Sequence, residues 1–329
     1  MTNAEGANSG RSFELSPAES MRIFEELIVP SQLNSERQRD PKILVVAGQP
    51  GSGKSSVQSE LKRRFHLAGA AEIDADDLRA FHPKWLDLSM RDDRSAADLT
   101  HPDATRWTAM SLEYAASQSY EVVLSATLGK VATTRKVLDS FRRGGYRIIV
   151  VIVAVNEVVS RLGILSRYMR QRATQGFGRF VPRKVHDLAY VGILETADAI
   201  DLNLLADEVI VSARAQVADF VYHNRLGAES RRWHRPPGTR EAITWERQKS
   251  WTAEEYLWYQ QTIVELSEVL PTDLLEEFNA IREAASGLVT EHERRTAVQM
   301  RQDPGATATS TIAVPRQRFP FHDSFLDEG

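Results

Sequence analysis

The fold of this chain is decided by the stretch Gly48-Gln49-Pro50-Gly51-Ser52-Gly53-Lys54-Ser55. It matches the pattern G-x-x-x-x-G-K-[S/T], in which glycine backbone N–H groups surround phosphate oxygens. An apolar run at 43–47 precedes it, as in a buried strand, and helical spacing of apolar residues follows over 55–65. A strand, a glycine loop and a helix in this order predict a nucleoside triphosphate site.

We expect Lys54 to reach the β- and γ-phosphates of ATP, and the Ser55 hydroxyl to be a ligand of Mg²⁺. The positive end of the helix dipole that begins near Lys54 points at the same anion. ATP is therefore expected to contact all the residues of the loop and the one after it: Gly48, Gln49, Pro50, Gly51, Ser52, Gly53, Lys54, Ser55 and Ser56.

Composition excludes several other classes of protein. The 329 residues suffice for one large α/β domain with appendages, and a net charge of −4 argues against a general nucleic-acid binder. The absence of cysteine excludes disulfides, thiolate metal sites and cysteine nucleophiles. Residues 1–11 lack the apolar core of a signal peptide, and no apolar run approaches the roughly 18 residues of a membrane span. We therefore expect a cytoplasmic protein without membrane contact.

Alternating strand and helix patterns predict an α/β fold: a P-loop NTPase-type open parallel sheet of about five strands, flanked by helices, with a helical C-terminal appendage. Strands are expected at 43–47, 70–73, 121–125, 148–155 and 208–211, with a candidate short strand at 220–223. Helices are expected at 16–29, ended by Pro30, and at 55–65, 104–117, 131–143, 157–172, 182–200, 252–270 and 273–286. Irregular structure is expected at 84–101 and 225–250.

Two carboxylates, Asp74 and Asp76, follow the expected strand at 70–73. Residues two apart in an extended chain point the same way, and open α/β sheets bind ligands beyond the carboxyl ends of their strands. In phosphoryl transfer, Asp74 can hold the water shell of Mg²⁺ and Asp76 can accept the proton of an attacking hydroxyl. The structural alternative is that Asp76 and Asp77 cap the next helix.

The segment 161–186 is strongly basic: it carries six arginines and a lysine, without any Asp or Glu, around Gly176 and Gly178. A basic, glycine-hinged segment at this place is typical of a lid that closes on the triphosphate, since arginine donates bidentately to phosphate. The alternative is a solvated basic face. Spacing alone does not tell which of the arginines contact the nucleotide.

Histidines and tryptophans give weaker signals. His82, His101 and His186 lack the spacing of metal ligands, so structural roles are favoured. Tryptophans and arginines interleave over 231–258, which could indicate single-stranded nucleic acid but is more often a helical appendage with its aromatic side chains packed inward.

Three stretches in this order resemble the zeta-toxin family of kinases. They are 48–55 with its Gln-Pro pair, 73–79 followed by His82-Pro83, and Arg167-Tyr168 followed by 179–187. The resemblance covers roughly residues 14–225. It implies ATP-dependent phosphorylation of a hydroxyl on UDP-N-acetylglucosamine, and a small antitoxin that blocks the nucleotide site.

The resemblance also implies roles for individual residues and divides the chain. Lys54 would bind phosphate, Ser55 magnesium and Asp76 the acceptor proton, while Arg167 and Arg179 would be the lid arginines. The catalytic residues are therefore expected to be Lys54, Asp76, Arg167 and Arg179. Four parts are expected along the chain: a disordered N-terminus 1–15, a zeta-toxin-like P-loop kinase domain 16–225, a helical C-terminal extension 226–300 and a disordered tail 301–329.

The sequence departs from the family's pattern where the acceptor would bind. Ser125, in a Ser-Ala-Thr run, stands where the family usually carries Glu, and Ala109 lies near an expected acidic position. Thr127 is retained, and Lys130 replaces the basic residue that follows. The acceptor is expected to contact Asp74, Asp76, Ser125, Thr127 and Lys130. The change at Ser125 leaves open a kinase of another nucleotide-like metabolite.

Two further classes of function stay open. In a nucleotide-gated binding protein, ATP would set the position of the lid and no phosphate would be transferred. A nucleic-acid end kinase would use the Trp- and Arg-rich segment 231–258 and would bind oligonucleotides in a salt-sensitive way. The acidic net charge makes nucleic acid the least favoured partner.

Overall fold

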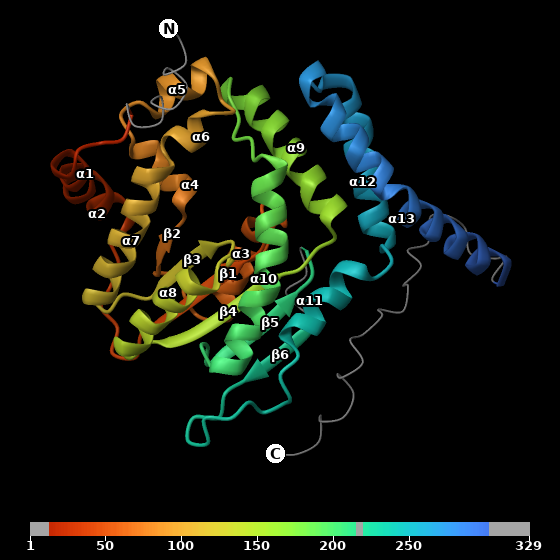
Figure 1. Ribbon diagram of the computed structural model, residues 1–329. Helices are drawn as coiled ribbons and strands as arrows, with labels where there is room; N and C mark the ends of the chain where they lie inside the picture. The colour runs from red at the N-terminus through yellow and green to blue at the C-terminus, as the bar shows by residue number, and fades with distance from the viewer. Residues whose placement is uncertain (1–12, 215–219, 303–329) are drawn as a thin grey trace, which may run out of the picture.

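The computed structural model describes residues 13–214 and 220–302 (Figure 1). The two segments predicted to be disordered, 1–15 and 301–329, therefore lie almost entirely outside the described residues. Within the described chain, no helix is both long enough and apolar enough to cross a membrane.

A six-stranded sheet forms the centre of the molecule, in the order β2-β3-β1-β4-β5-β6. The strands are β1 Lys42–Ala47, β2 Ala71–Ile73, β3 Val122–Ala126, β4 Arg147–Val153, β5 Glu208–Ser212 and β6 Tyr222–Arg225. The first five are parallel, and β6 pairs with β5 in the antiparallel direction. The predicted open parallel sheet is confirmed. The candidate strand at 220–223 begins two residues later and is the antiparallel edge strand.

The central strand β1 explains why both faces of the sheet carry helices. Ile43 and Val45 pack into one hydrophobic cluster, Leu44 and Val46 into the other, and all four are fully buried. Full burial of such a side chain contributes about 1.5–3 kcal/mol. The first cluster includes residues of α7 His101–Ser117, α8 Val131–Arg143, α10 Arg183–Asn203 and α11 Thr239–Gln248. The second includes residues of α3 Lys54–Arg64, α9 Glu157–Gln175, α12 Ala253–Val269 and α13 Leu275–Gln302.

The N-terminal helix is longer than predicted. Ser16 caps α1 Pro17–Ile23 by accepting the N–H of Glu19, as its sequence indicates. The helix then passes through the π-helical turn η1 Phe24–Ile28 into α2 Val29–Gln32. The prediction that Pro30 ends the helix is wrong, because the helix continues through Pro30 to Gln32, and the π-helical turn just before Pro30 changes the hydrogen-bond register where its N–H is missing.

The segment predicted to be irregular at 84–101 contains two short helices, α5 Trp85–Arg91 and α6 Ala96–Leu99. Each is held by one buried apolar side, with Leu88 in α5 and Ala96 and Ala97 in α6. Two short elements precede them, α4 Ala75–Leu78 and η2 Arg79–Phe81. Helices of one or two turns are too short to show a clear apolar period. Because the segment is also highly charged, the sequence did not indicate them.

The C-terminal region departs most from its prediction. Helix α11 occupies part of the expected loop 225–250, because Ala242 and Ile243 are fully buried in the first cluster. The capping box that begins α12 is confirmed, with Thr252 and Glu255 exchanging hydrogen bonds. After the turn η3 Thr272–Leu274, α13 continues to Gln302 instead of ending near 286. These helices pack into the same clusters as the sheet, and the domain boundary at 225 stays a prediction.

Candidate active site

The phosphate-binding loop lies between β1 and α3, and its glycines are required by geometry. Gly51 has φ 78°, and a Cβ there would lie 1.9 Å from the carbonyl oxygen of Ser160 in α9. Gly53 has φ 90°, a left-handed conformation that side chains rarely adopt. The loop therefore packs directly on α9, and its backbone is held in the conformation that the motif needs.

Lys54, the first residue of α3, is held against the loop that precedes it. Its Nζ donates hydrogen bonds to the carbonyl oxygens of Gly48 at 2.9 Å and Gln49 at 3.4 Å. Burial lowers the pKa of Lys54 to about 8, with Asp74 opposing the shift and the positive charges of Arg167 and Arg179 adding to it. The ammonium group is therefore surrounded by cations, an arrangement that a bound polyphosphate would neutralise.

Ser55 and Asp74 offer oxygen ligands of the kind that Mg²⁺ binds beside a nucleotide. The Ser55 side chain is exposed in the first turn of α3, directly after Lys54. Mg²⁺ is usually held by one or two protein oxygens together with phosphate oxygens and waters. A cluster of three or more His, Cys, Asp or Glu side chains that could hold a metal by itself is absent from the described residues. The donor set therefore suits a nucleotide-bound metal.

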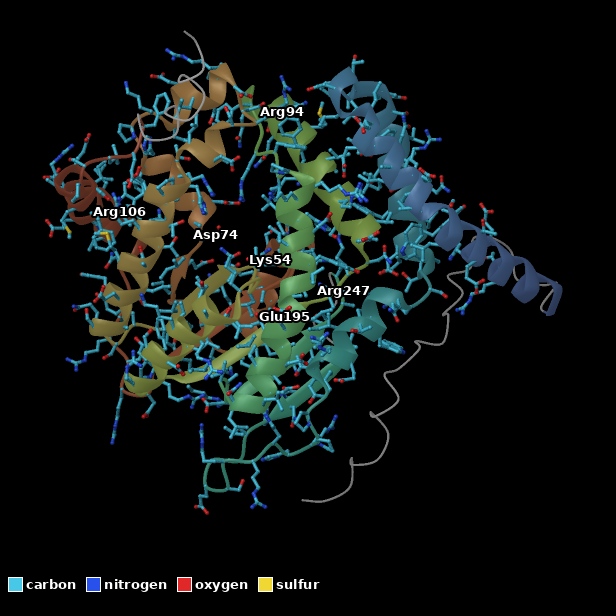
Figure 2. All side chains as sticks on the ribbon, viewed as in Figure 1. Lys54, Asp74, Arg94, Arg106, Glu195 and Arg247 are labelled. Atoms are coloured by element: carbon cyan, nitrogen blue, oxygen red, sulfur yellow. The ribbon has the colours of Figure 1, made fainter. Side chains whose placement is uncertain are left out.

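Asp74 and Asp76 lie beside each other, although not as an extended pair. Strand β2 ends at Ile73, and Asp74 is the N-cap of α4, accepting the backbone N–H of Asp76 at 2.8 Å. The expected alternation along a strand is wrong, and so is the alternative in which Asp76 and Asp77 are the caps. Figure 2 shows Asp74 at the start of α4, with Lys54 between Asp74 and Arg247 in this view.

Both carboxylate oxygens of Asp76 are engaged by arginines. Oδ1 forms an ion pair with Arg79 of η2, and Oδ2 forms one with Arg179, which lies between α9 and α10. Arg79 is itself nearly fully buried, at 4% exposure. The candidate base is therefore fixed in place on one side by a neighbouring turn, and covered on the other by the basic segment.

The structure separates the arginines of the basic segment by their partners. The charges of Arg167 and Arg179 act on Lys54, and burial lowers the pKa of both guanidinium groups, Arg179 to about 10. Nε and Nη2 of Arg167 and Nε of Arg179 are buried and lack hydrogen-bond partners within the described residues. Three other arginines form ion pairs with acids of the protein: Arg161 with Glu277, Arg172 with Asp93 and Arg183 with Asp187.

Asp93, in the turn between α5 and α6, anchors the basic segment. It accepts hydrogen bonds from the Tyr168 hydroxyl at 2.8 Å and from the backbone N–H of Gly178 at 2.9 Å. A Cβ on Gly178 would lie 2.4 Å from the carbonyl oxygen of Tyr168, so only glycine fits. The two predicted glycine positions have different uses: Gly176 ends α9 with φ 82°, and Gly178 allows close packing.

The residues predicted for the acceptor lie at the end of β3 and in the loop after it. Ser125 is half-buried, and Thr127 and Lys130 are exposed. The pKa of the neighbouring His101 is lowered, mainly by burial and also by the positive charges of Arg79 and Lys130. Ala109 is exposed on α7. This side of the site therefore combines hydroxyl groups with cationic or weakly basic side chains.

Sequence reasoning missed the residue that holds Gln49, Arg247 of α11. Gln49 is fully buried and donates to the carbonyl oxygen of Val155 at 3.1 Å and to Ser160 Oγ at 3.3 Å. Its Oε1 accepts from Arg247 Nη2 at 3.1 Å, and Arg247 also donates to the carbonyl oxygen of Tyr190. Figure 2 shows Arg247 on α11, beside α10. No local signal marks this contact, because 198 residues separate its partners.

Two of the three histidines, His82 and His186, and the tryptophans have structural positions, as favoured, whereas His101 is exposed. His82 and His186 are buried and bond the carbonyl oxygen of Phe13 and Ser160 Oγ, respectively. Trp251 is buried, and three other tryptophans of the C-terminal region are partly buried against the two clusters: Trp233, Trp245 and Trp258. The aromatic side chains are therefore packed inward, and are not displayed as a stacking surface for nucleic acid.

A cavity of about 370 Å³ lies behind the basic segment, away from the phosphate loop. It is bounded by α9, the start of α10 and α13, and its walls carry charges of both signs, including Arg94, Arg161 and Glu277. None of residues 48–56 lines it. Across this region Arg94 pairs with Asp273 at 2.6 Å and Arg161 with Glu277 at 2.8 Å, so α13 is tied to α9.

Comparison with known proteins agrees with this architecture. A family model described as "Zeta toxin" matches residues 28–226, more than half of the chain. Toxin PezT of Streptococcus pneumoniae is 23% identical over 150 residues, which are 45% of this chain and 59% of that protein. Toxin zeta of Enterococcus hirae is 25% identical over 150 residues, 45% of this chain and 52% of that protein. The matched stretch thus spans somewhat more than half the length of these relatives.

A solved structure shows the same fold. A chain from the PezAT chromosomal toxin–antitoxin system of Streptococcus pneumoniae superposes with a TM-score of 0.66 at 16% identity, covering 79% of this chain and 100% of that one. The resemblance carried by the three sequence motifs is confirmed by the family match. This chain belongs to the zeta toxin family.

Proposed function

We propose that the protein is an ATP-dependent phosphotransferase that moves the γ-phosphate of ATP to a hydroxyl group of a small molecule. The observation that supports this most is that Lys54 lies in the phosphate loop, that the charges of Arg167 and Arg179 both act on it, and that both arginines have buried donor atoms without a hydrogen-bond partner among the described residues. Unpartnered guanidinium donors beside a P-loop suit an anionic ligand, because phosphate oxygens would pair them bidentately.

In this proposal the loop 48–56 and the start of α3 bind the phosphates, and Lys54 bridges the β- and γ-phosphates. Arg167 and Arg179 stabilise the charge that develops on the transferred group. Ser55 would ligate Mg²⁺ directly and Asp74 through water, and the bound ion would neutralise phosphate charge. Asp77, whose pKa burial raises, lies close enough to Asp74 for their charges to interact.

Asp76 is the proposed general base. It accepts the proton of the acceptor hydroxyl while the acceptor oxygen bonds to phosphorus, and the bond between phosphorus and the leaving oxygen of ADP breaks. Arg179 pairs with Asp76, and in the proposed reaction it exchanges this carboxylate for phosphate oxygens so that Asp76 can accept the proton. Arg79, on the other carboxylate oxygen, can stay and orient the base.

The proposed acceptor is a nucleotide sugar such as UDP-N-acetylglucosamine, following the family resemblance, with contacts from Asp74, Ser125, Thr127 and Lys130. Hydroxyl and cationic groups suit the phosphates of such a molecule. The relatives named as toxins, and the toxin–antitoxin system that shares the fold, suggest that this chain is a toxin. We propose a small antitoxin that covers its nucleotide site.

A second candidate is a nucleotide-gated binding protein that transfers no phosphate. Two observations favour this second candidate. Both carboxylate oxygens of Asp76 are paired with arginines, and Ser125 stands where the family resemblance implies an acidic residue. In this case nucleotide would move Arg179 without chemistry, and a partner's affinity would depend on ATP.

The test is a search for the phosphorylated product. Wild-type protein and the variant Lys54→Met are incubated with Mg²⁺, a metabolite extract and ATP labelled in its γ-phosphate, and mass spectrometry detects labelled small molecules. We expect a labelled product with wild-type protein alone, and a nucleotide sugar phosphate would identify the acceptor class. ATP binding by wild-type protein without any labelled product would favour the gated binding protein instead.

A further inference from the structure

Arg214 lies two residues after the end of β5, against the last glycine of the phosphate loop. A Cβ on Gly53 would be 3.2 Å from Cγ of Arg214 and 3.4 Å from its Nε. Gly53 immediately precedes Lys54, so the Arg214 side chain passes beside the residue at which the loop becomes helix α3. Strand β5 is parallel to β4 and ends at the same edge of the sheet, where ligands of open α/β sheets bind.

Trp258 of α12 holds this side chain in place. The guanidinium carbon of Arg214 lies 3.9 Å from the centroid of the Trp258 ring, well within the range of a cation–π contact. Trp258 is partly buried in the second hydrophobic cluster, which limits how far its ring can move. It also lies outside residues 28–226, the part of the chain that matches the family model.

Apart from the Trp258 ring, the guanidinium group of Arg214 has no hydrogen-bond or ion-pair partner among the described residues. Its Nη1 is buried without a hydrogen bond, and no ion pair to Arg214 occurs within residues 13–214 and 220–302. Glu255 is the acid whose charge reaches it, but Glu255 accepts the backbone N–H of Thr252 at the start of α12. Arg161 and Arg247, which are also buried, both donate to protein acceptors.

The position of Arg214 along a bound nucleotide follows from its neighbours. Lys54, which follows Gly53, is the residue that reaches the β- and γ-phosphates in this motif. Arg214 lies beside Gly53, at the end of the loop where helix α3 begins. The backbone of this loop surrounds the α- and β-phosphates, so the side away from the γ-phosphate belongs to the nucleoside end.

We propose that Arg214 binds the α-phosphate of the nucleotide and that Trp258 is the positioning residue that holds it there. The inference rests on the proposed nucleotide site and adds a cation from β5, with its support from α12. The C-terminal helices then contribute to nucleotide affinity, in addition to their packing against the sheet. In this arrangement Arg167 and Arg179 bind the γ-phosphate. Arg214 binds the α-phosphate, which ATP and ADP share with other nucleotides.

Calorimetric titration of the full chain with ATP, ADP and GTP tests the proposal without any acceptor. We expect Arg214→Ala to lower the affinities for ATP, ADP and GTP by the same factor, roughly 10- to 100-fold. Arg214→Lys should restore part of the lost affinity. The matched control is Arg282→Ala, which removes an arginine 5.9 Å from the Phe278 ring in α13 and should leave all three affinities unchanged.

The positioning role of Trp258 has its own readout. Trp258→Leu should weaken all three nucleotides less than Arg214→Ala, and the double variant should bind no more weakly than Arg214→Ala alone, because the ring acts through the guanidinium. Additive losses in the double variant would overturn this role. Circular dichroism and thermal melting verify that each variant is folded, and Arg214→Lys provides a second, charge-conserving test.

Three results would overturn the α-phosphate assignment. Unchanged ATP affinity in Arg214→Ala would remove the contact altogether. A loss of affinity for ATP but not for ADP would mean that Arg214 contacts the γ-phosphate. A loss of affinity for ATP but not for GTP would mean that it contacts the base. Lys54→Met separates this inference from the proposed function. If ATP affinity is lost in Lys54→Met but kept in Arg214→Ala, the proposed nucleotide site is supported and the role of Arg214 is contradicted.

Discussion

The phosphate side and the acceptor side of the candidate site differ in how their charged groups are paired. On the phosphate side, Arg167 and Arg179 have buried donor atoms without hydrogen-bond partners, and Lys54 bonds only carbonyl oxygens of the loop. On the acceptor side, Asp76 is fully paired, with one arginine on each carboxylate oxygen. The phosphate side therefore offers free donors to an anion, whereas both oxygens of the candidate base are paired with arginines.

This difference links the two halves of the proposed reaction. Arg179 belongs to both sides, because its Nη1 pairs with Asp76 while its Nε is buried and unpartnered near Lys54. A triphosphate that attracts Arg179 would release one oxygen of Asp76 at the moment the phosphate is in place. Binding of nucleotide and exposure of the base then become a single exchange of ion-pair partners. The predictions below test each side separately.

The largest effect is expected from Lys54→Met. Loss of the cation that reaches the β- and γ-phosphates should weaken ATP at least 100-fold and reduce transfer by more than about 1,000-fold. Calorimetry and the γ-label assay measure the two quantities. The control is Lys62→Met on the same helix, where Lys62 pairs with Glu72 away from the loop, and it should leave both unchanged. ATP affinity retained by Lys54→Met would contradict the account of the phosphate side.

The second largest effect concerns Arg167→Ala. An arginine that stabilises the transferred phosphoryl group contributes about 1,000-fold or more to transfer in related chemistry, so we expect a loss of roughly 100- to 1,000-fold. Affinity should fall for ATP but not for ADP, since the contact is to the γ-phosphate. Arg170→Ala, an exposed arginine one turn along α9, is the matched control. Equal losses in the two variants would mean that only general positive charge matters.

A smaller effect is expected from Arg247→Ala, which removes a brace of the phosphate side. Gln49 Oε1 would lose its partner in a buried position, at a cost of about 2–4 kcal/mol in the free energy of unfolding. Because the loop would lose rigidity, ATP affinity should fall about 5- to 10-fold. Urea unfolding and calorimetry measure the two losses. If Arg247→Ala loses stability with full ATP affinity, Arg247 supports the fold alone.

The smallest effect is a dependence on pH. The folded pKa of Lys54, about 8, lies below its ordinary value of 10.5, so burying the charge costs stability below pH 8. This cost fades as pH rises from 8 toward 10.5, because the folded protein releases the proton first. ATP affinity should fall over the same range, by at most tenfold per pH unit. Calorimetry at pH 7, 8 and 9 measures it, and an affinity that rises with pH would contradict the assignment.

Much of the phosphate side could be predicted because local sequence determines it. The glycine loop needs φ angles that only glycine adopts freely, and Lys54 and Ser55 follow it at a fixed spacing. The basic segment 161–186 was also recognisable by its composition. Which arginines face the nucleotide was not, because the partners Asp93 and Glu277 come from distant parts of the chain.

The braces of the site could not be predicted for the same reason. Arg247 and Arg214 reach the loop through contacts with Gln49 and Gly53 that depend on tertiary packing. Residues 225–250 carry Gly, Pro and many arginines, which favours a surface loop, although part of this segment forms α11. Asp74 illustrates a local error: β2 ends before it, and the residue caps a helix instead of continuing a strand.

The variant Asp76→Asn tests most directly whether Asp76, which pairs with Arg179, is the general base. ATP affinity and transfer of γ-label to the metabolite extract are measured on the same preparations of wild-type and variant protein. We predict that transfer falls about 100- to 10,000-fold while ATP binds at least as tightly, because Arg179 is no longer held by a carboxylate. Transfer equal to that of the wild type would contradict the assignment of the base.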